Sequence, residues 1–280
     1  MSVVVKTWRY IARNPSGMVG LALLLVLGLI AVLAPWIAPH SPYDSDTSRK
    51  LLPPCRAYWL GTDELGRDLL SRLIVGSRFS LVVGFVSVAV GLAGGLVLGS
   101  LAGYYGGKVD RLVMLLCDIL LAFPGVLLAL AIAVALGPGL TNTMLAVGLS
   151  SVPLFTRLVR GQFLSLREST LVESARAVGS GDLRIMRGYL LPNSWGPVVV
   201  QATLRLASAI LMAATLSFLG LGAQPPEPEW GAMLSGARTY LWVAPHLAVF
   251  PGLCITVAVI AINLVGDSLR DALDPRLRQG

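Results

Sequence analysis

Long apolar blocks alternate with shorter polar segments along the chain, and they predict its helices. A helix that crosses a membrane needs about 20 largely apolar residues, and six blocks approach that length. The predicted spans are 17–38, 80–103, 112–137, 140–156, 197–222 and 245–266. The first block is too long for a cleaved signal peptide and lacks a small-residue cleavage site, so we interpret it as a retained helix.

The overall composition supports this interpretation. The 280 residues are 55% hydrophobic and 13% charged, and the mean hydropathy is +0.75. A soluble domain carries about 25% charged residues. A soluble fold of this size cannot bury so much apolar sequence, so the excess must face lipid. We therefore predict an all-α membrane protein with six transmembrane helices.

The basic residues predict the orientation, because lysine and arginine favour the cytoplasmic side of a membrane. With the N-terminus inside, the cytoplasmic segments hold fourteen of them and the outer segments seven, and Arg205 within a span completes the 22. Both termini are then cytoplasmic, and the net charge of +7 reflects topology rather than nucleic-acid binding. The predicted parts are a cytoplasmic N-terminus (1–16), helix 1 (17–38), an extracytoplasmic loop (39–78), a transmembrane core (79–266) with a cytoplasmic loop (161–196), and a cytoplasmic tail (267–280).

The predicted outer loop contains an amphipathic stretch. Thr62 is a suitable N-cap for a helix that reaches Ile74. Leucines such as Leu69 fall on one face of this helix, and charged residues such as Asp63 and Arg72 fall on the other. We expect the helix to lie flat on the outer membrane surface.

The predicted cytoplasmic loop carries the signals of two short helices. Thr170 with Glu173 three residues later forms a capping box, and Gly179 is a typical helix-ending glycine. Asp182 can cap a second helix, which we expect to stop before Pro192. The loop therefore predicts a helix–turn–helix unit on the cytoplasmic side.

Glycines and prolines within the spans predict close packing and bends. Span two carries a stripe of glycines at four-residue spacing, Gly91, Gly95, Gly99 and Gly103. Such a stripe lets another helix backbone approach closely. Spans three, four and six contain Pro124, Pro153 and Pro251, which predict kinks. The kinks are either static bends or a means of bending the spans around a central pathway, and the sequence favours neither.

Two ionisable residues fall inside predicted spans. An intramembrane charge is by default a functional hypothesis, and Asp118 in span three and Arg205 in span five are such charges. Both lie toward the cytoplasmic ends of their spans, where Arg205 can extend its guanidinium to the interface. We expect them to pair with each other and interpret them as structural before substrate-binding residues.

The sequence carries no set of residues for catalysis. It has no Walker A motif, so this chain cannot hydrolyse ATP through a P-loop. No Ser/His/Asp set, carboxylate pair or Cys/His cluster is visible, which predicts no metal site. These residues predict a six-helix membrane protein with a folded cytoplasmic loop. A transporter subunit, a channel and a membrane scaffold are all compatible with them.

Several stretches nevertheless resemble one family. The segment from Glu173 to Gly179, Glu-Ser-Ala-Arg-Ala-Val-Gly, followed by Leu-Leu-Pro ending at Pro192, resembles the EAA loop of permeases from binding-protein-dependent ABC importers. Ser174 replaces the first alanine of that pattern. Three further stretches resemble the peptide and nickel subfamily, closest to the second permease of dipeptide and glutathione importers: Trp59–Arg72, Leu216–Gly231 and Asn263–Arg276.

The resemblance implies a fold, partners and site residues. It implies the type I ABC importer permease fold in the bacterial inner membrane, a homologous second permease, two ATPase subunits that bind ATP and Mg, and an extracytoplasmic substrate-binding protein. This chain would hold no cofactor and would contact lipid but no nucleic acid. The implied ATPase-coupling residues are Glu173, Ala175, Gly179, Leu191 and Pro192. The implied substrate is a dipeptide, oligopeptide or glutathione, with nickel or another small solute as the alternative.

A segment on the outer side is a candidate for seating the binding protein. Trp230 with the rigid Pro225 and Pro226 would form an exposed aromatic anchor. The alternative is that Trp230 belongs to an interfacial belt of aromatic residues. The sequence does not decide between the two.

Overall fold

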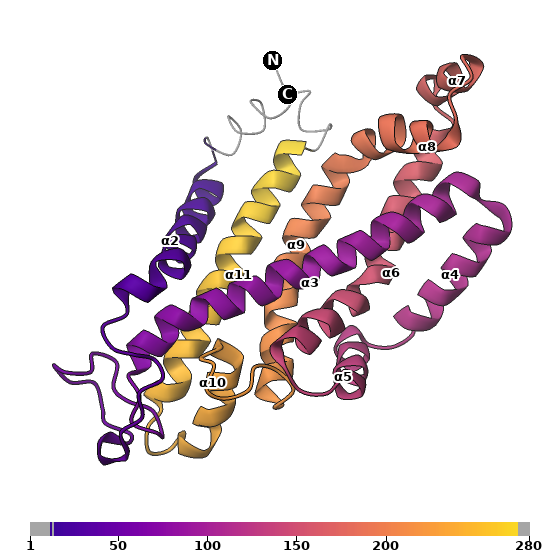
Figure 1. Ribbon diagram of the computed structural model, residues 1–280. Coiled ribbons are helices and arrows are strands. Elements are labelled where there is room, and N and C mark those ends of the chain that lie inside the picture. The colour runs from indigo at the N-terminus through magenta and orange to yellow at the C-terminus, as the bar shows by residue number, and fades with distance from the viewer. Residues whose placement is uncertain (1–11, 13, 274–280) are drawn as a thin grey trace.

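The computed structural model describes residue 12 and residues 14–273, and this part of the chain is helical (Figure 1). One isolated β-bridge joins Thr62 and Asp68. The helices are α2 (Pro15–Ile37), α3 (Leu69–Tyr105), α4 (Gly107–Leu121), α5 (Gly125–Leu136), α6 (Leu140–Arg167), α7 (Thr170–Ala177), α8 (Asp182–Ile185), α9 (Leu191–Phe218), α10 (Trp230–Ala237) and α11 (His246–Leu273). A π-helical turn, Met186–Leu190, joins α8 to α9.

Four helical stretches are long and apolar enough to cross a membrane: Pro15–Ile37, Leu69–Tyr105, Asp182–Phe218 and His246–Leu273. The pair α4 and α5 makes a fifth if the two count as one broken span. The predicted all-helical membrane fold is thus confirmed. The fourth predicted span, 140–156, corresponds to α6, whose 28 residues include several charges.

The long helices form a layer that α3 crosses diagonally (Figure 1). The short helices α7 and α8 lie at one end of this layer, and α10 lies at the other with the loop that precedes α3. The start of α2 and the end of α11 lie at the α7 end, where the Asn14 amide donates to the Ser268 hydroxyl at 3.3 Å. We call these two ends the α7 end and the α10 end.

The predicted glycine stripe on α3 does allow a close helix approach. A Cβ added to Gly99 would lie 2.7 Å from the Thr156 carbonyl oxygen and from the Val159 Cβ on α6. One added to Gly103 would lie 2.6 Å from the Phe163 Cβ, and Gly95 contacts Phe155 still more closely. All four stripe glycines face α6 in this way, so α3 and α6 pack backbone against backbone.

The predicted outer helix is wrong in both its start and its position. Residues 62–68 form a turn, and α3 begins at Leu69 with Asp68 as its N-cap, accepting from the Ser71 amide at 2.9 Å. Thr62 instead donates to the Arg49 carbonyl oxygen and accepts from the Leu52 amide. The polar face of the stretch is buried by the preceding loop, so the amphipathic pattern marks the first turns of a spanning helix and not a helix lying on the surface.

The third predicted span is not one continuous helix. It divides into α4 and α5, which meet at 94° across a break of residues 122–124. Pro124 is the N-cap of α5, and a proline cannot continue the hydrogen bonding of the preceding helix. By contrast, Pro153 and Pro251 lie inside the continuous helices α6 and α11.

Candidate functional site

The α7–α8 unit (residues 170–185) is the folded element between α6 and α9 that the sequence predicts. Gly179 ends α7 with φ +79°. The Gly179 amide donates to the Arg176 carbonyl and the Ser180 amide donates to the Ala175 carbonyl, at 2.9 and 3.0 Å. This is the Schellman pattern, which needs a left-handed residue that glycine adopts without strain. The predicted role of Gly179 in the turn is therefore confirmed.

Other local predictions for this unit are wrong. Ser169, not Thr170, is the N-cap of α7, and it makes no side-chain cap bond because its hydroxyl donates to the Leu166 carbonyl. Gly181 is the N-cap of α8, so Asp182 is the first helical residue and does not cap the helix.

Pro192 does not stop the second helix either. The helical run continues across it from α8 through the π turn into α9. A proline lacks the N–H that an α-helical bond would need, and Pro192 falls in the first turn of α9, directly after the wider π turn. The Leu191 amide there donates to the Met186 carbonyl, five residues earlier.

An apolar cluster fixes the α7–α8 unit to the long helices. Val172, Ala175 and Ile185 are buried and pack with Val159 and Phe163 of α6. One polar contact supplements this packing, because the Tyr104 hydroxyl at the end of α3 donates to Asp182 Oδ1 at 2.7 Å. Burial of an apolar side chain stabilises such contacts by about 1.5–3 kcal/mol each, so the apolar cluster is the main attachment.

The opposite side of the unit is open. Glu173 is exposed, and so are two apolar side chains, Leu171 and Val178. Val178 has 81% of its surface exposed, at the tip of the turn. Apolar side chains gathered on an exposed surface are typical of a contact with another protein.

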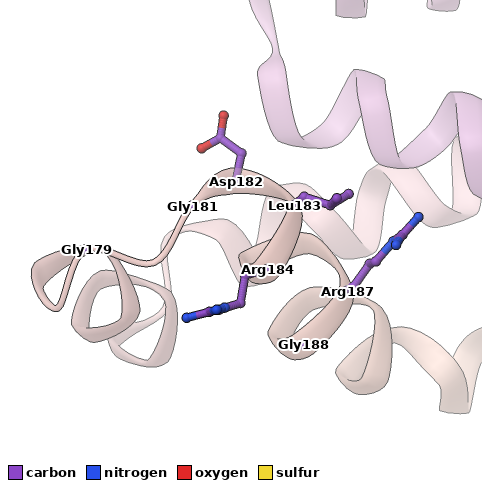
Figure 2. Close-up of a pocket in the computed structure, with 7 residues that line it drawn as sticks. All are labelled: Gly179, Gly181, Asp182, Leu183, Arg184, Arg187 and Gly188. Atoms are coloured by element: carbon purple, nitrogen blue, oxygen red, sulfur yellow. The ribbon is translucent and has the colours of Figure 1, made fainter.

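A hollow of about 820 Å³ opens beside this exposed side. Figure 2 shows its lining residues, with Arg184 and Arg187 leaving the chain in different directions. An added Cβ at Gly179, Gly181 or Gly188 would meet no atom within 4 Å. The hollow thus combines an open glycine-rich wall with two arginines and the carboxylate of Asp182.

The five EAA-loop residues are distributed over this unit and the start of α9. Ala175 is buried under α7, whereas Glu173 and Gly179 lie on the open side. Leu191 is half-buried and Pro192 is exposed in the first turn of α9. Their coupling role stays a prediction.

The two intramembrane charges do not pair with each other as expected. Asp118 Oδ1 lies 2.6 Å from the Arg157 Nη2 of α6. Arg205 has no ion-pair or hydrogen-bond partner in the part of the chain that the structure describes. A second pair on the same two helices joins Asp110 to Arg160.

At the α10 end, a buried set of charges lies where the sequence analysis expected an exposed polar face. We call Asp63, Arg67, Asp68 and Arg72 the outer cluster. Asp63 Oδ2 lies 2.7 Å from Arg67 Nε and 3.2 Å from Arg72 Nε. Asp68 Oδ2 lies 3.4 Å from His40 Nδ1. The sequence did contain a signal for this burial, because acidic and basic residues alternate within the stretch Trp59–Arg72. Opposite charges at such spacing can pair with one another when they are buried.

The outer cluster ties segments that are distant in sequence. The Arg72 guanidinium donates to the Pro42 carbonyl at 2.9 Å and to the Pro226 carbonyl at 3.4 Å. Nearby, an exposed turn holds Asp46 and Ser48. The Ser48 hydroxyl and the Ser48 amide both donate to the Asp46 carboxylate. These bonds, the hydroxyl bond above all, keep the pKa of Asp46 below its ordinary value.

Trp230 is neither an exposed anchor nor part of an interfacial belt. Only 1% of its surface is exposed, and its Nε1 donates to the Leu73 carbonyl at 3.0 Å. Glu229 caps α10 beside it by accepting from the Gly231 and Ala232 amides. Pro225 and Pro226 are exposed and line a shallow hollow, so they stay candidates for seating a partner whereas Trp230 is a core residue.

Comparison with known proteins shows the family of this chain. Residues 95–279 match the family described as the binding-protein-dependent transport system inner membrane component. The chain belongs to this family. Residues 2–54 also match the N-terminal transmembrane domain of oligopeptide transport permease C. The protein is thus a multi-pass inner-membrane component, as the sequence resemblance implied.

Individual relatives extend this result over almost the whole permease. This chain is 49% identical over 275 residues to the glutathione transport system permease protein GsiD of Pectobacterium atrosepticum, and the match covers 97% of this chain and 90% of that one. The corresponding Escherichia coli protein is 47% identical over 274 residues with the same coverage. In fold, the permease resembles a chain of the MetNI methionine ABC transporter in an inward-facing structure, with TM-score 0.58, 22% identity, and 72% and 96% coverage of the two chains.

Proposed function

We propose that this chain is the permease subunit of an ATP-driven importer that moves short peptides, glutathione among them, into the cell by alternating access. The observation that carries the proposal is the 47–49% identity to glutathione permeases over nearly the full length of both chains. Nickel import, the alternative that the sequence leaves open, has no support among these relatives. Family membership argues against a channel or scaffold that acts without an ATPase.

The proposed partners are a homologous permease, two ATPase subunits and an extracytoplasmic binding protein. The ATPases would hold ATP and Mg, since this chain has no Walker A motif. The open side of the α7–α8 unit, with Leu171 and Val178 exposed, supports docking of an ATPase there. Leaving these side chains in water would be unfavourable, and a partner surface would cover them.

In this proposal the α7–α8 unit converts ATPase movement into movement of the spans. Coupling requires each ATPase state to favour one permease state through differential contacts. Glu173 would supply a polar contact, and Gly179 would set the angle at which α7 meets the ATPase. Ala175 would hold the unit on its apolar base, and Leu191 and Pro192 would carry the motion into α9.

The six-span topology with cytoplasmic termini is part of the proposal. It places the α7 end in the cytoplasm and the α10 end outside. A single cysteine at Ser180 should react with an impermeant thiol reagent only from the cytoplasmic side, and one at Glu227 only from outside. Swapped labelling would reverse the orientation and remove the argument for ATPase docking at α7.

The transport function is tested with the complete importer, purified through a tag on this chain and reconstituted in vesicles. With ATP supplied to the ATPases and binding protein present, labelled glutathione or a labelled dipeptide should accumulate. Nickel is the matched alternative substrate in the same assay. Uptake of nickel but of neither peptide, or uptake that does not depend on ATP, would contradict the proposal.

A further inference from the structure

The Asp118–Arg157 ion pair is exposed, and it lies well away from the ends of the two helices that carry it, α4 and α6. The two side chains are 60% and 50% exposed. Asp118 is eleven residues from the start of α4, and Arg157 is ten residues from the end of α6. At 1.5 Å per residue both lie roughly 15 Å from the cytoplasmic ends of their helices.

Exposed leucines show that this depth is inside the apolar belt. Lys108 and Arg111 mark the polar start of α4, and the leucines that follow, including Leu112 and Leu116, are more than half exposed. Asp118 lies beyond them, farther from the cytoplasmic end. A charged pair this far in is costly against lipid tails and normally faces protein or a water-filled cavity.

The packing of α3 on α6 shows on which side of α6 the ion pair lies. The stripe glycines of α3 meet Phe155, Thr156 and Val159. Helical periodicity then places Arg157 and Gly161 on the side of α6 that points away from α3. In agreement, a Cβ added to Gly161 would meet no atom within 4 Å.

Helix α9 presents a polar stripe in the same direction. Its side toward α3 is fixed by Ile210 and Leu206, which contact Gly84. Polar residues follow at helical spacing on the other side, with Gln201 and Ser208 about half a turn away and Arg205 about a third of a turn away. Arg205 lies midway along α9 without a partner among the described residues, so its charge is available on this face.

We propose that the face of α4, α6 and α9 that points away from α3 lines the solute pathway, and that Asp118, Arg157 and Arg205 form a site there for a small zwitterion. The two guanidiniums match the carboxylates of such a solute, and the Asp118 carboxylate matches its ammonium group. Asp118 and Arg157 neutralise each other when the site is empty and exchange partners when it is occupied. The choice of a peptide-like zwitterion rests on the proposed function.

The first test measures water access in the complete importer, with its three native cysteines replaced. Single cysteines at Ser208 and Gly161 lie on the proposed face, and one at Val199 lies on the opposite, exposed side of α9. A charged thiol reagent applied to open membranes should modify the first two at least about tenfold faster than the third. Equal, slow modification of all three would show that the second permease or lipid covers the face, and would overturn the assignment.

The second test separates substrate contact from structure. Arg205→Gln should lower peptide uptake at least about tenfold while the complex assembles and the binding protein still stimulates ATP hydrolysis. Lys108→Gln, a charge removal at the exposed start of α4, is the control and should transport normally. Loss of the second permease on purification of Arg205→Gln, or unchanged uptake, would overturn the site.

Failure of this inference differs from failure of the proposed function. If the unsubstituted importer takes up no peptide, the proposed substrate is wrong, whatever the labelling shows. If it takes up peptide while Ser208→Cys stays unreactive, only the pathway assignment is wrong.

Discussion

The α10 end joins its loop to the helices through buried ion pairs. The α7–α8 unit instead rests mainly on an apolar cluster, and its polar contacts converge on Tyr104, which donates to Asp182 and lies under the Arg176 guanidinium. Directional bonds at the α10 end fix several segments at defined angles. Apolar packing at the α7 end is less directional, so the α7–α8 unit can shift while it stays attached. This difference suits an outer end that keeps its shape and an inner end that responds to a partner.

Helix α3 connects the two ends. It starts with Leu69 beside the outer cluster and ends with Tyr105 beside the α7–α8 unit. Its glycine stripe holds it against α6 along the way. A change at either end can therefore be transmitted along one continuous helix pair.

The largest expected effect comes from breaking the outer cluster. Asp63→Ala leaves the buried Arg67 and Arg72 without their shared carboxylate, and removal of one partner of a buried pair costs about 3–5 kcal/mol. Thermal unfolding of the purified complex measures the change. The control is Glu64→Ala, which removes a more exposed carboxylate from the same Arg67 and should cost less than about 1 kcal/mol. Equal melting temperatures for the two variants would show that the outer cluster does not stabilise this end.

The next largest effect is expected on the connecting helix. Gly95→Leu places a side chain where the Phe155 side chain and backbone already lie, and overpacking of this kind costs about 3 kcal/mol. The yield of folded protein and its melting temperature should fall. Gly28→Leu on α2 is the control, because an added Cβ there meets nothing within 4 Å. A normal yield and melting temperature for Gly95→Leu would contradict the close approach of α3 and α6.

The smallest effect is expected at the hydrogen bond that helps to attach the α7–α8 unit. Tyr104→Phe removes the hydrogen bond to Asp182 and should cost about 1 kcal/mol. Hydrogen exchange should speed up in residues 170–185 and stay unchanged around the outer cluster. Tyr105→Phe changes an exposed neighbour and should alter neither region. Faster exchange at both ends after Tyr104→Phe would mean that the ends are not held independently.

The features predicted correctly from the sequence are those whose cause is local. The glycine stripe repeats at helical spacing, and Gly179 ends a helix within its own few residues, so both were visible without a fold. The burial of Trp230 was not, because Leu73 comes from a helix more than 150 positions earlier. The partner of Asp118 is a similar case, since Arg157 and Arg205 both lie on other helices and only the fold distinguishes them.

The outer helix was misread for a different physical reason. An amphipathic pattern indicates that one face is polar, but it does not show whether water or other protein groups meet that face. Arg72 meets the Pro42 and Pro226 carbonyls, so its polar side is buried. A surface helix and the first turns of a spanning helix therefore have the same pattern.

The most direct test of the proposed coupling role compares two glycines of the α7–α8 unit. Both Gly179 and Gly181 have open space around an added Cβ, but only Gly179 has a positive φ, +79° against −69°. Gly179→Val strains the turn and misplaces α7 against the ATPase, whereas Gly181→Ala leaves the backbone unstrained.

The measurement is uptake per ATP hydrolysed by the reconstituted importer. We predict at least a tenfold fall for Gly179→Val, about 1.4 kcal/mol of lost bias between permease states, and no change for Gly181→Ala. Wild-type uptake per ATP for Gly179→Val would contradict the account, because the α7–α8 unit would then not transmit the ATPase movement.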